Sequence, residues 1–193
     1  MPRQMSISIV FGPPLAGKTT FVQLHEPTMH HISLGRIARK VSRGSSSIST
    51  TITASITNNT PLDSHLLLNL IFQNENLSSV KENVIDGYPK YVHEVDPLID
   101  YCAKYKITTQ NLYILERPYG LLKKRLKHRR VCENCYMPAA LSGTCLCRNT
   151  HLYKREEDSV EYFQGRWERY IEQASGVISR LDKHFTSIVI KDE

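Results

Sequence analysis

An eight-residue segment near the amino terminus constrains the fold more than any other feature of this 193-residue chain. Residues 12–19, GPPLAGKT, match G-x-x-x-x-G-K-[ST] and stand between an apolar segment and a helical one. In that context the backbone N–H groups of the loop and the start of the helix attract phosphate groups. Lys18 is then expected to reach the β- and γ-phosphates of a nucleoside triphosphate, and Thr19 to bind Mg²⁺. The alternative is a chance match in a Gly/Pro turn.

Five short segments are expected to form strands, because most of them are apolar runs rich in Ile and Val, which are typical of strands covered on both faces by helices. They are residues 6–11, 30–33, 83–86, 111–116 and 186–191. Helical patterns occupy residues 18–24, 34–42, 63–72, 94–104, 119–129 and 157–185. We expect Asp63 to cap the third helix, the last helix to break near Gly176, and residues 45–60 to form a loop or a short helix. This alternation predicts an α/β fold with a parallel sheet.

Composition and length are typical of one globular domain spanning residues 1–193, with 40% hydrophobic and 23% charged residues. They exclude a disordered tail, a collagen and a coiled-coil rod. No apolar run reaches the roughly 20 residues that a membrane-spanning helix needs. The first residues lack the pattern of a signal peptide, so we expect a cytoplasmic protein that does not bind a membrane.

Four of the five cysteines lie close together, at Cys132, Cys135, Cys145 and Cys147, whereas Cys102 stands alone. In a chain without an export signal, this clustering favours a zinc site over reduced or disulfide-bonded thiols. Four protein ligands would leave no open position on the metal, so the zinc is expected to be structural.

The third predicted strand ends in Asp86, and Gly87 follows it. An Asp at the carboxyl end of a parallel strand, beside a phosphate-binding loop, can hold Mg²⁺ directly or through water. A turn-forming Asp-Gly pair is the alternative.

Five segments together resemble the adenylate kinase family of nucleoside monophosphate kinases. In the order of that family, they are GPPLAGKTT, HISLGRIAR, IDGYPK, KKRLKHRRV and REEDSVEYFQGR. The resemblance implies a three-layer α/β/α P-loop kinase fold with a five-stranded parallel sheet and two mobile inserts. Residues 32–76 would bind the acceptor, and residues 130–155 would form a zinc-holding lid. The implied reaction transfers the γ-phosphoryl group of ATP, with Mg²⁺, to a nucleoside monophosphate, in a protein that is a monomer.

The same resemblance implies the roles of individual residues. The ATP-binding residues would be Gly12, Pro13, Pro14, Leu15, Ala16, Gly17, Lys18, Thr19, Thr20, Arg125 and Arg129. The acceptor-binding residues would be Leu34, Arg39, Gly87, Lys90, Glu94, Arg155 and Arg166. Thr19 and Asp86 would hold Mg²⁺. Catalysis by positioning and charge neutralisation would rest on Lys18, Asp86, Arg125, Arg129, Arg155 and Arg166.

Most departures from the family pattern lie on the acceptor side. Leu15 replaces a Gly of the phosphate loop, Leu34 a Thr, Arg36 an Asp and Lys90 an Arg. Glu94 stands where the family commonly has a Gln that reads adenine. An ionised carboxylate only accepts hydrogen bonds, so it would suit the two donors of guanine better than adenine. An ion pair of Glu94 with Arg36 or Lys90 is the alternative.

Three other functions stay open. The chain could bind ATP without turnover, or phosphorylate a different acceptor such as a nucleoside or a small phosphorylated metabolite. It could also be a nucleic-acid-binding zinc module, because six of the eight residues 123–130 are Lys or Arg. That last function would leave residues 12–19 and Asp86 without a task, so no nucleic-acid partner is expected.

Overall fold

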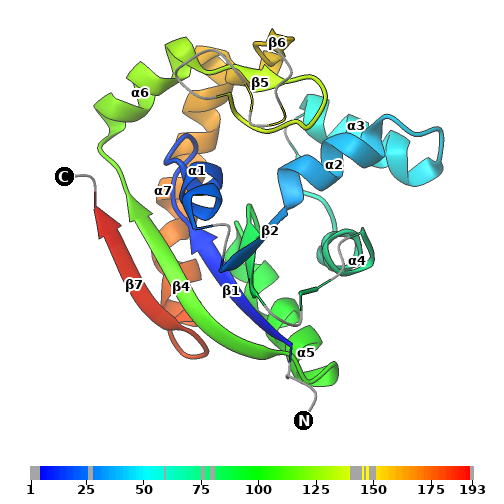
Figure 1. The fold of residues 1–193 in the computed structure, drawn as a ribbon, viewed down its shortest axis with the longest axis vertical. Helices are drawn as coiled ribbons and strands as arrows, with labels where there is room; N and C mark the ends of the chain where they lie inside the picture. Colours follow the sequence, from blue (N-terminus) through cyan, green and yellow to red (C-terminus); the bar gives the residue numbers. More distant parts are fainter. Residues whose placement is uncertain are drawn as a thin grey trace.

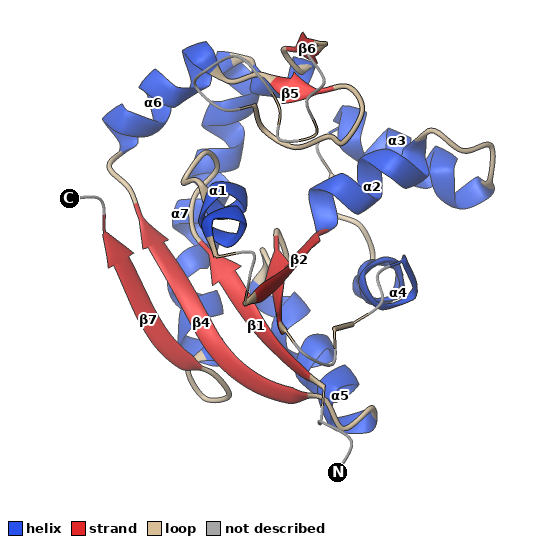
Figure 2. Cartoon of the chain, viewed as in Figure 1, coloured by secondary structure: helices blue, strands red, loops and turns tan. Residues whose placement is uncertain are grey.

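Five parallel strands form the central sheet, in the order β2-β3-β1-β4-β7 (Figures 1 and 2). This computed structural model describes residues 5–25, 28–58, 60–74, 77–78, 81–139, 145, 147 and 151–191. The strands are β1 (Ser6–Phe11), β2 (Met29–Ser33), β3 (Glu82–Asp86), β4 (Thr108–Glu116) and β7 (Thr186–Lys191). All five predicted strands are present, and β4 begins three residues earlier than expected.

Helices cover both faces of the sheet, because side chains alternate along each strand. Ile7, Ile9 and Phe11 of β1 join the larger core cluster, which also includes side chains from α4 (Ser64–Asn74), α5 (Val95–Lys104) and α7 (Val160–Leu181). Val10 belongs to a smaller cluster with α1 (Lys18–Leu24). The result is the three-layer α/β/α arrangement that the sequence predicts.

Two insertions lie at the carboxyl end of the sheet, because each follows directly from the end of a strand (Figure 1). Between β2 and β3 come α2 (Leu34–Ser42), α3 (Ser47–Asn58) and α4. After β4 come α6 (Tyr119–His128), the two-stranded hairpin β5 (Val131–Cys132) and β6 (Leu152–Tyr153), and the 3-10 turn η2 (Glu156–Asp158). A second 3-10 turn, η1 (Val92–Glu94), precedes α5. The predicted end of the acceptor insert at residue 76 lies outside the described residues.

The segment expected to be a loop or short helix is the twelve-residue helix α3. Its hydroxyl groups bond to carbonyl oxygens one turn back, as Thr51 does to Ser47 at 3.1 Å. The predicted cap of α4 is confirmed, since the N–H of Leu66 donates to Asp63 Oδ1 at 3.0 Å. Within the described parts of the chain, no helix is both long and apolar enough to cross a bilayer.

The predicted break at Gly176 is wrong, because α7 runs without interruption from Val160 to Leu181. Gly176 serves a close approach instead. A Cβ atom built on it would lie 2.6 Å from Cγ2 of Val92 in η1. The glycine therefore lets α7 pack directly against the turn that precedes α5.

Candidate active site

The phosphate loop (residues 12–19) connects β1 to α1, and the side chain of Lys18 forms hydrogen bonds with the backbone of the loop. Lys18 Nζ donates hydrogen bonds to the carbonyl oxygens of Gly12 and Pro13, both at 2.9 Å. Gly12 has φ 153°, and a Cβ there would lie 2.7 Å from the carbonyl oxygen of Leu115 in β4. Only glycine fits this close approach, so the first position of the motif is set by the neighbouring strand.

Leu15, where the family has glycine, adopts the left-handed conformation with φ 68°. Its side chain packs against a cluster formed by Leu122, Leu126 and Phe163. Arg125 of α6 braces the same turn, because its Nη1 donates to the carbonyl oxygens of Leu15 and Ala16 at 3.2 and 3.1 Å. Apolar packing and the hydrogen bonds of Arg125 thus support a left-handed backbone at Leu15 that glycine would adopt more easily.

Thr19, in the first turn of α1, meets Asp86, at the carboxyl end of β3. The Thr19 hydroxyl donates to Asp86 Oδ2 at 2.9 Å, and His31 Nε2 of β2 lies 3.3 Å from the same oxygen. Burial alone would raise the pKa of Asp86, but His31, Lys18 and Thr19 outweigh it and hold that pKa below its usual value. The carboxylate is therefore ionised and fixed, as an Mg²⁺ ligand must be.

Positive charge gathers around this carboxylate. Burial first, and then the nearby charges of Arg166, Arg129 and Lys90, lower the pKa of Lys18 to about 8, although the charge of Asp86 opposes them. A bound anion would offset the repulsion between these cations and stabilise the charged form of Lys18.

Asp158, which sequence reasoning missed, organises two of the predicted arginines. Arg155 donates to it through Nε at 2.9 Å and Nη2 at 2.7 Å, and Arg129 Nε lies 3.6 Å from Asp158 Oδ2. Burial would raise the pKa of Asp158 and lower that of Arg155, but their pairing reverses both effects. The buried pair holds Arg155 in one orientation. Its position three residues after Arg155 was the available signal.

The remaining arginines are crowded together. Burial, followed by the charge of Arg155, lowers the pKa values of Arg39, Arg129 and Arg166 to about 10 each. These side chains come from α2, the end of α6 and α7, so the fold brings distant segments to one place. Such a concentration of cations, only partly offset by Asp86 and Asp158, is suited to a polyanionic ligand.

Two of the other predicted acceptor residues, Leu34 and Glu94, are buried. Leu34 is 4% exposed and belongs to the core, and a Cβ on Gly87 would lie 3.8 Å from it. Glu94 is 1% exposed, and its Oε2 accepts hydrogen bonds from the backbone N–H groups of Lys90 and Tyr91. Glu94 thus caps η1, because two orphan N–H groups lie within its reach, and its contact with a base stays a prediction. Lys90 itself is exposed.

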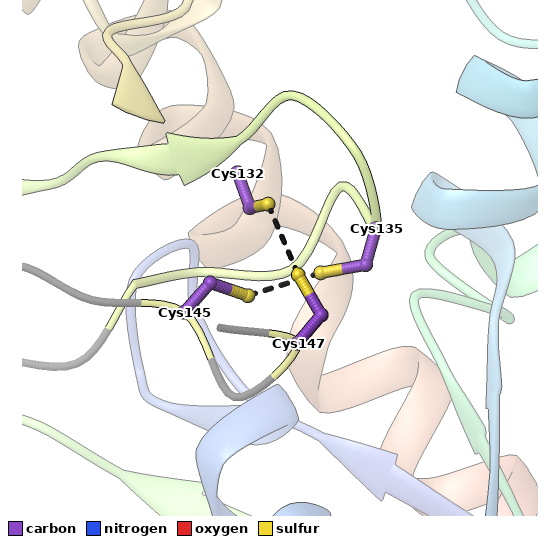
Figure 3. Close-up of side chains that lie close together, drawn as sticks. All are labelled: Cys132, Cys135, Cys145 and Cys147. Carbon is purple, nitrogen blue, oxygen red and sulfur yellow. Dashed lines mark hydrogen bonds between the residues drawn. The ribbon is translucent and has the colours of Figure 1, made fainter. Parts of the chain in front are cut away.

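Four cysteines that lie close together in the sequence converge in the hairpin after α6 (Figure 3). We call this region the cysteine hairpin: residues 131–139 and 151–153 with Cys145 and Cys147. Cys132 Sγ lies 3.5 Å from Cys147 Sγ, and Cys135 Sγ lies 3.1 Å from Cys145 Sγ. All four sulfur atoms lie within 4.8 Å of one another. A tetrahedral ZnS₄ centre with Zn–S bonds of about 2.3 Å has S···S edges of about 3.8 Å, so the cluster fits the metal.

The surroundings of these thiols also affect their protonation. Burial and hydrogen bonds to neighbouring thiols raise the pKa of Cys135 to about 12, and burial also raises the pKa of Cys145. Without a cation the site would hold neutral thiols, whereas Zn²⁺ binds thiolates and would displace their protons.

The structure thus brings together Lys18, Thr19, Asp86, Arg129, Arg155 and Arg166, with Arg39 and Lys90 near the arginines. The other loop residues, from Pro13 to Thr20, form the turn and the start of α1. Besides Asp158, sequence reasoning missed His31, whose position inside the predicted strand 30–33 carried no chemical signal.

Comparison with known proteins gives a consistent result. No profile of a protein family matches the chain. The adenylate kinase of Thermosipho melanesiensis is 29% identical over 190 residues, covering 92% of this chain and 88% of that protein. Those of Desulforamulus reducens and Pelagibacter ubique are each 26% identical, over 88% and 93% of this chain and 84% and 90% of their own lengths. With the fold and the phosphate loop, these relatives make the chain similar to the adenylate kinases along most of its length.

Proposed function

We propose that this protein transfers the γ-phosphoryl group of ATP to a nucleoside monophosphate. The observation that carries the proposal is the convergence of Lys18 and the arginines on the Thr19–Asp86 pair. Phosphoryl transfer asks for little covalent chemistry from the protein and much positioning and charge neutralisation, which is what these residues supply. The curated relatives, named as adenylate kinases, support the same reaction class.

Each group has a task in this proposal. Lys18 would leave the carbonyl oxygens of Gly12 and Pro13 to meet the β- and γ-phosphates. Thr19 and Asp86 would hold the Mg²⁺ that accompanies ATP and that neutralises phosphate charge. Arg129, Arg155 and Arg166 would stabilise the charge that spreads over the transferred group. Arg39 and Lys90 would hold the acceptor phosphate, Lys90 as a point charge rather than a bidentate fork.

The test is release of ADP from Mg·ATP with AMP, GMP, CMP and UMP as acceptors. Lys18→Ala should abolish turnover, and Lys124→Ala, at an exposed position of α6, is the matched control. Arg129→Ala and Arg155→Ala should lower kcat more than they change ATP affinity. A wild-type protein that binds ATP but releases ADP with no monophosphate would reject this function. It would favour a different acceptor, or a protein that binds ATP without turnover.

We propose further that the cysteine hairpin holds one structural Zn²⁺, and that residues 130–155, which contain this hairpin, form a lid over ATP. The four-sulfur cluster supports this, since a two-stranded hairpin is marginally stable on its own and a bound metal would stabilise it. The metal would bind through Cys132, Cys135, Cys145 and Cys147 and would stabilise the shape of the hairpin. Metal analysis should find about one zinc per chain, lost in Cys132→Ser and retained in Cys102→Ser. A zinc-free protein with four reactive lid thiols would contradict this proposal.

A further inference from the structure

Tyr136 has a backbone conformation that its side chain disfavours. It follows Cys135 in the cysteine hairpin and has φ 59°, in the left-handed region that costs free energy for any residue with a Cβ. Its N–H donates to the carbonyl oxygen of Cys132 at 3.0 Å, and the N–H of Cys132 donates to Met137 at 3.0 Å. Glycine would form this turn at least as well, so the turn does not explain why a tyrosine occupies the position.

The ring of Tyr136 and its backbone carbonyl group both contact side chains of α2 and of the residue that caps it. The guanidinium carbon of Arg43, the residue that caps α2, lies 4.5 Å from the centre of the Tyr136 ring. One turn earlier, Arg39 Nη2 donates to the carbonyl oxygen of Tyr136 at 3.4 Å. Residues four apart share one face of a helix, so Tyr136 contacts a single face of α2 at two points.

The space beside these contacts is open. A cavity of about 650 Å³ is lined by Arg43, Glu133, Asn134 and Tyr153, which belong to the end of α2 and to the hairpin. Along this cavity the two segments are not packed together. Tyr136 therefore connects two insertions that are far apart in sequence and that join the sheet at different strands.

We propose that Tyr136 is a positioning residue that couples the hairpin to acceptor binding, an inference that rests on the proposed function. Its carbonyl group holds the guanidinium of Arg39 until an acceptor phosphate replaces it. Its ring stays on Arg43 and keeps the hairpin against α2 while the acceptor is bound. The strain at φ 59° persists because glycine would supply the turn but not the ring.

A double-mutant cycle tests this coupling. Tyr136→Gly keeps the backbone turn but removes the ring, and we expect it to raise the KM of the acceptor about two- to fivefold, with the KM of ATP unchanged. Arg43→Ala should have the same effect, and the double variant should add nothing further. Tyr136→Phe keeps the ring and should behave as wild type. Additive effects, or a Tyr136→Gly variant with wild-type kinetics, would overturn the proposal.

Hydrogen exchange without substrates supplies a measurement that needs no kinase activity. Amides of α2 and of residues 131–139 should exchange faster in Tyr136→Gly and in Arg43→Ala than in wild type or Tyr136→Phe. Equal exchange in all four proteins would reject the coupling even if the enzyme is active. If instead the wild type transfers no phosphoryl group, the proposed function fails, and the exchange rates still decide whether Tyr136 joins the two insertions.

Discussion

His31 Nε2 lies 3.3 Å from Asp86 Oδ2, the same oxygen that accepts the hydrogen bond of Thr19. Side chains behind a metal ligand set its orientation, and their loss typically costs about 10–100-fold in metal affinity. We therefore expect His31→Ala to raise the Mg²⁺ concentration needed for half-maximal ADP release about tenfold.

His31→Gln, which can still donate to Asp86, should recover most of this effect, and His128→Ala on the exposed face of α6 should show none. A Mg²⁺ titration of ADP release at saturating ATP gives these values. An unchanged Mg²⁺ requirement in His31→Ala would mean that Thr19 alone orients the carboxylate.

Leu15 combines a left-handed backbone with a packed side chain. Leu15→Gly loses apolar packing but relieves about 1–2 kcal/mol of backbone strain, so its free energy of unfolding should stay within about 1 kcal/mol of wild type. Leu15→Ala loses packing and keeps the strain, so it should be the less stable variant. Urea unfolding of both proteins decides the order, and an alanine variant as stable as the glycine variant would refute this account.

Gly176 and Gly120 form a matched pair of helical glycines. Alanine is the better helix former, yet a Cβ on Gly176 would lie 2.6 Å from the stiff side chain of Val92. Gly176→Ala should therefore lower the free energy of unfolding by about 1–3 kcal/mol. At Gly120 of α6 a Cβ would meet no other side chain of the described residues within 4 Å, and Gly120→Ala should be neutral or stabilising by up to about 1 kcal/mol. Equal effects in thermal unfolding would disprove the close approach.

Glu94 has a structural contact where a base-reading one was expected from sequence. Removing its buried carboxylate leaves the N–H groups of Lys90 and Tyr91 without their acceptor, so Glu94→Ala should cost about 1–3 kcal/mol of stability. Glu94→Gln retains an acceptor oxygen and should be less damaging. We expect the ratio of AMP to GMP efficiency to be the same in wild type and in Glu94→Gln. A change of that ratio towards AMP would restore the base-reading role.

Cys102 gives the fold a sensitivity to alkaline pH. Burial raises the pKa of its thiol to about 12, whereas an unfolded cysteine ionises near about 8.5. Between these pH values the unfolded chain loses a proton that the folded chain keeps, so the free energy of unfolding falls as pH rises, by up to about 1.4 kcal/mol per pH unit. From pH 8.5 to 10.5, wild type should lose stability more steeply than Cys102→Ala. Parallel pH profiles would show that this thiol does not contribute.

Much of the fold follows from local patterns in the sequence. Strands buried on both faces need apolar segments, and the predicted segments became the five strands of one sheet, although β7 at its edge is largely exposed. The phosphate loop could be located because its glycines and lysine must occupy fixed positions relative to a strand and a helix. The cysteine cluster was predictable for the same reason, since metal ligands need short, regular spacings.

Tertiary contacts decided what no local pattern could. From the sequence alone, Gly176 indicates a helix break, whereas in the structure it allows Val92 to pack closely against α7. Glu94 indicates a contact with the ligand, whereas in the structure it accepts hydrogen bonds from two backbone N–H groups. His31 and Asp158 became part of the candidate site only when separate strands and helices brought Asp86, Arg129 and Arg155 beside them. The sequence by itself determined the layers of the fold and the kind of chemistry, because burial and phosphate binding select residue types. The three-dimensional packing decided which side chain serves which partner, because hydrogen bonds and charges act over a few ångströms between residues that are distant along the chain.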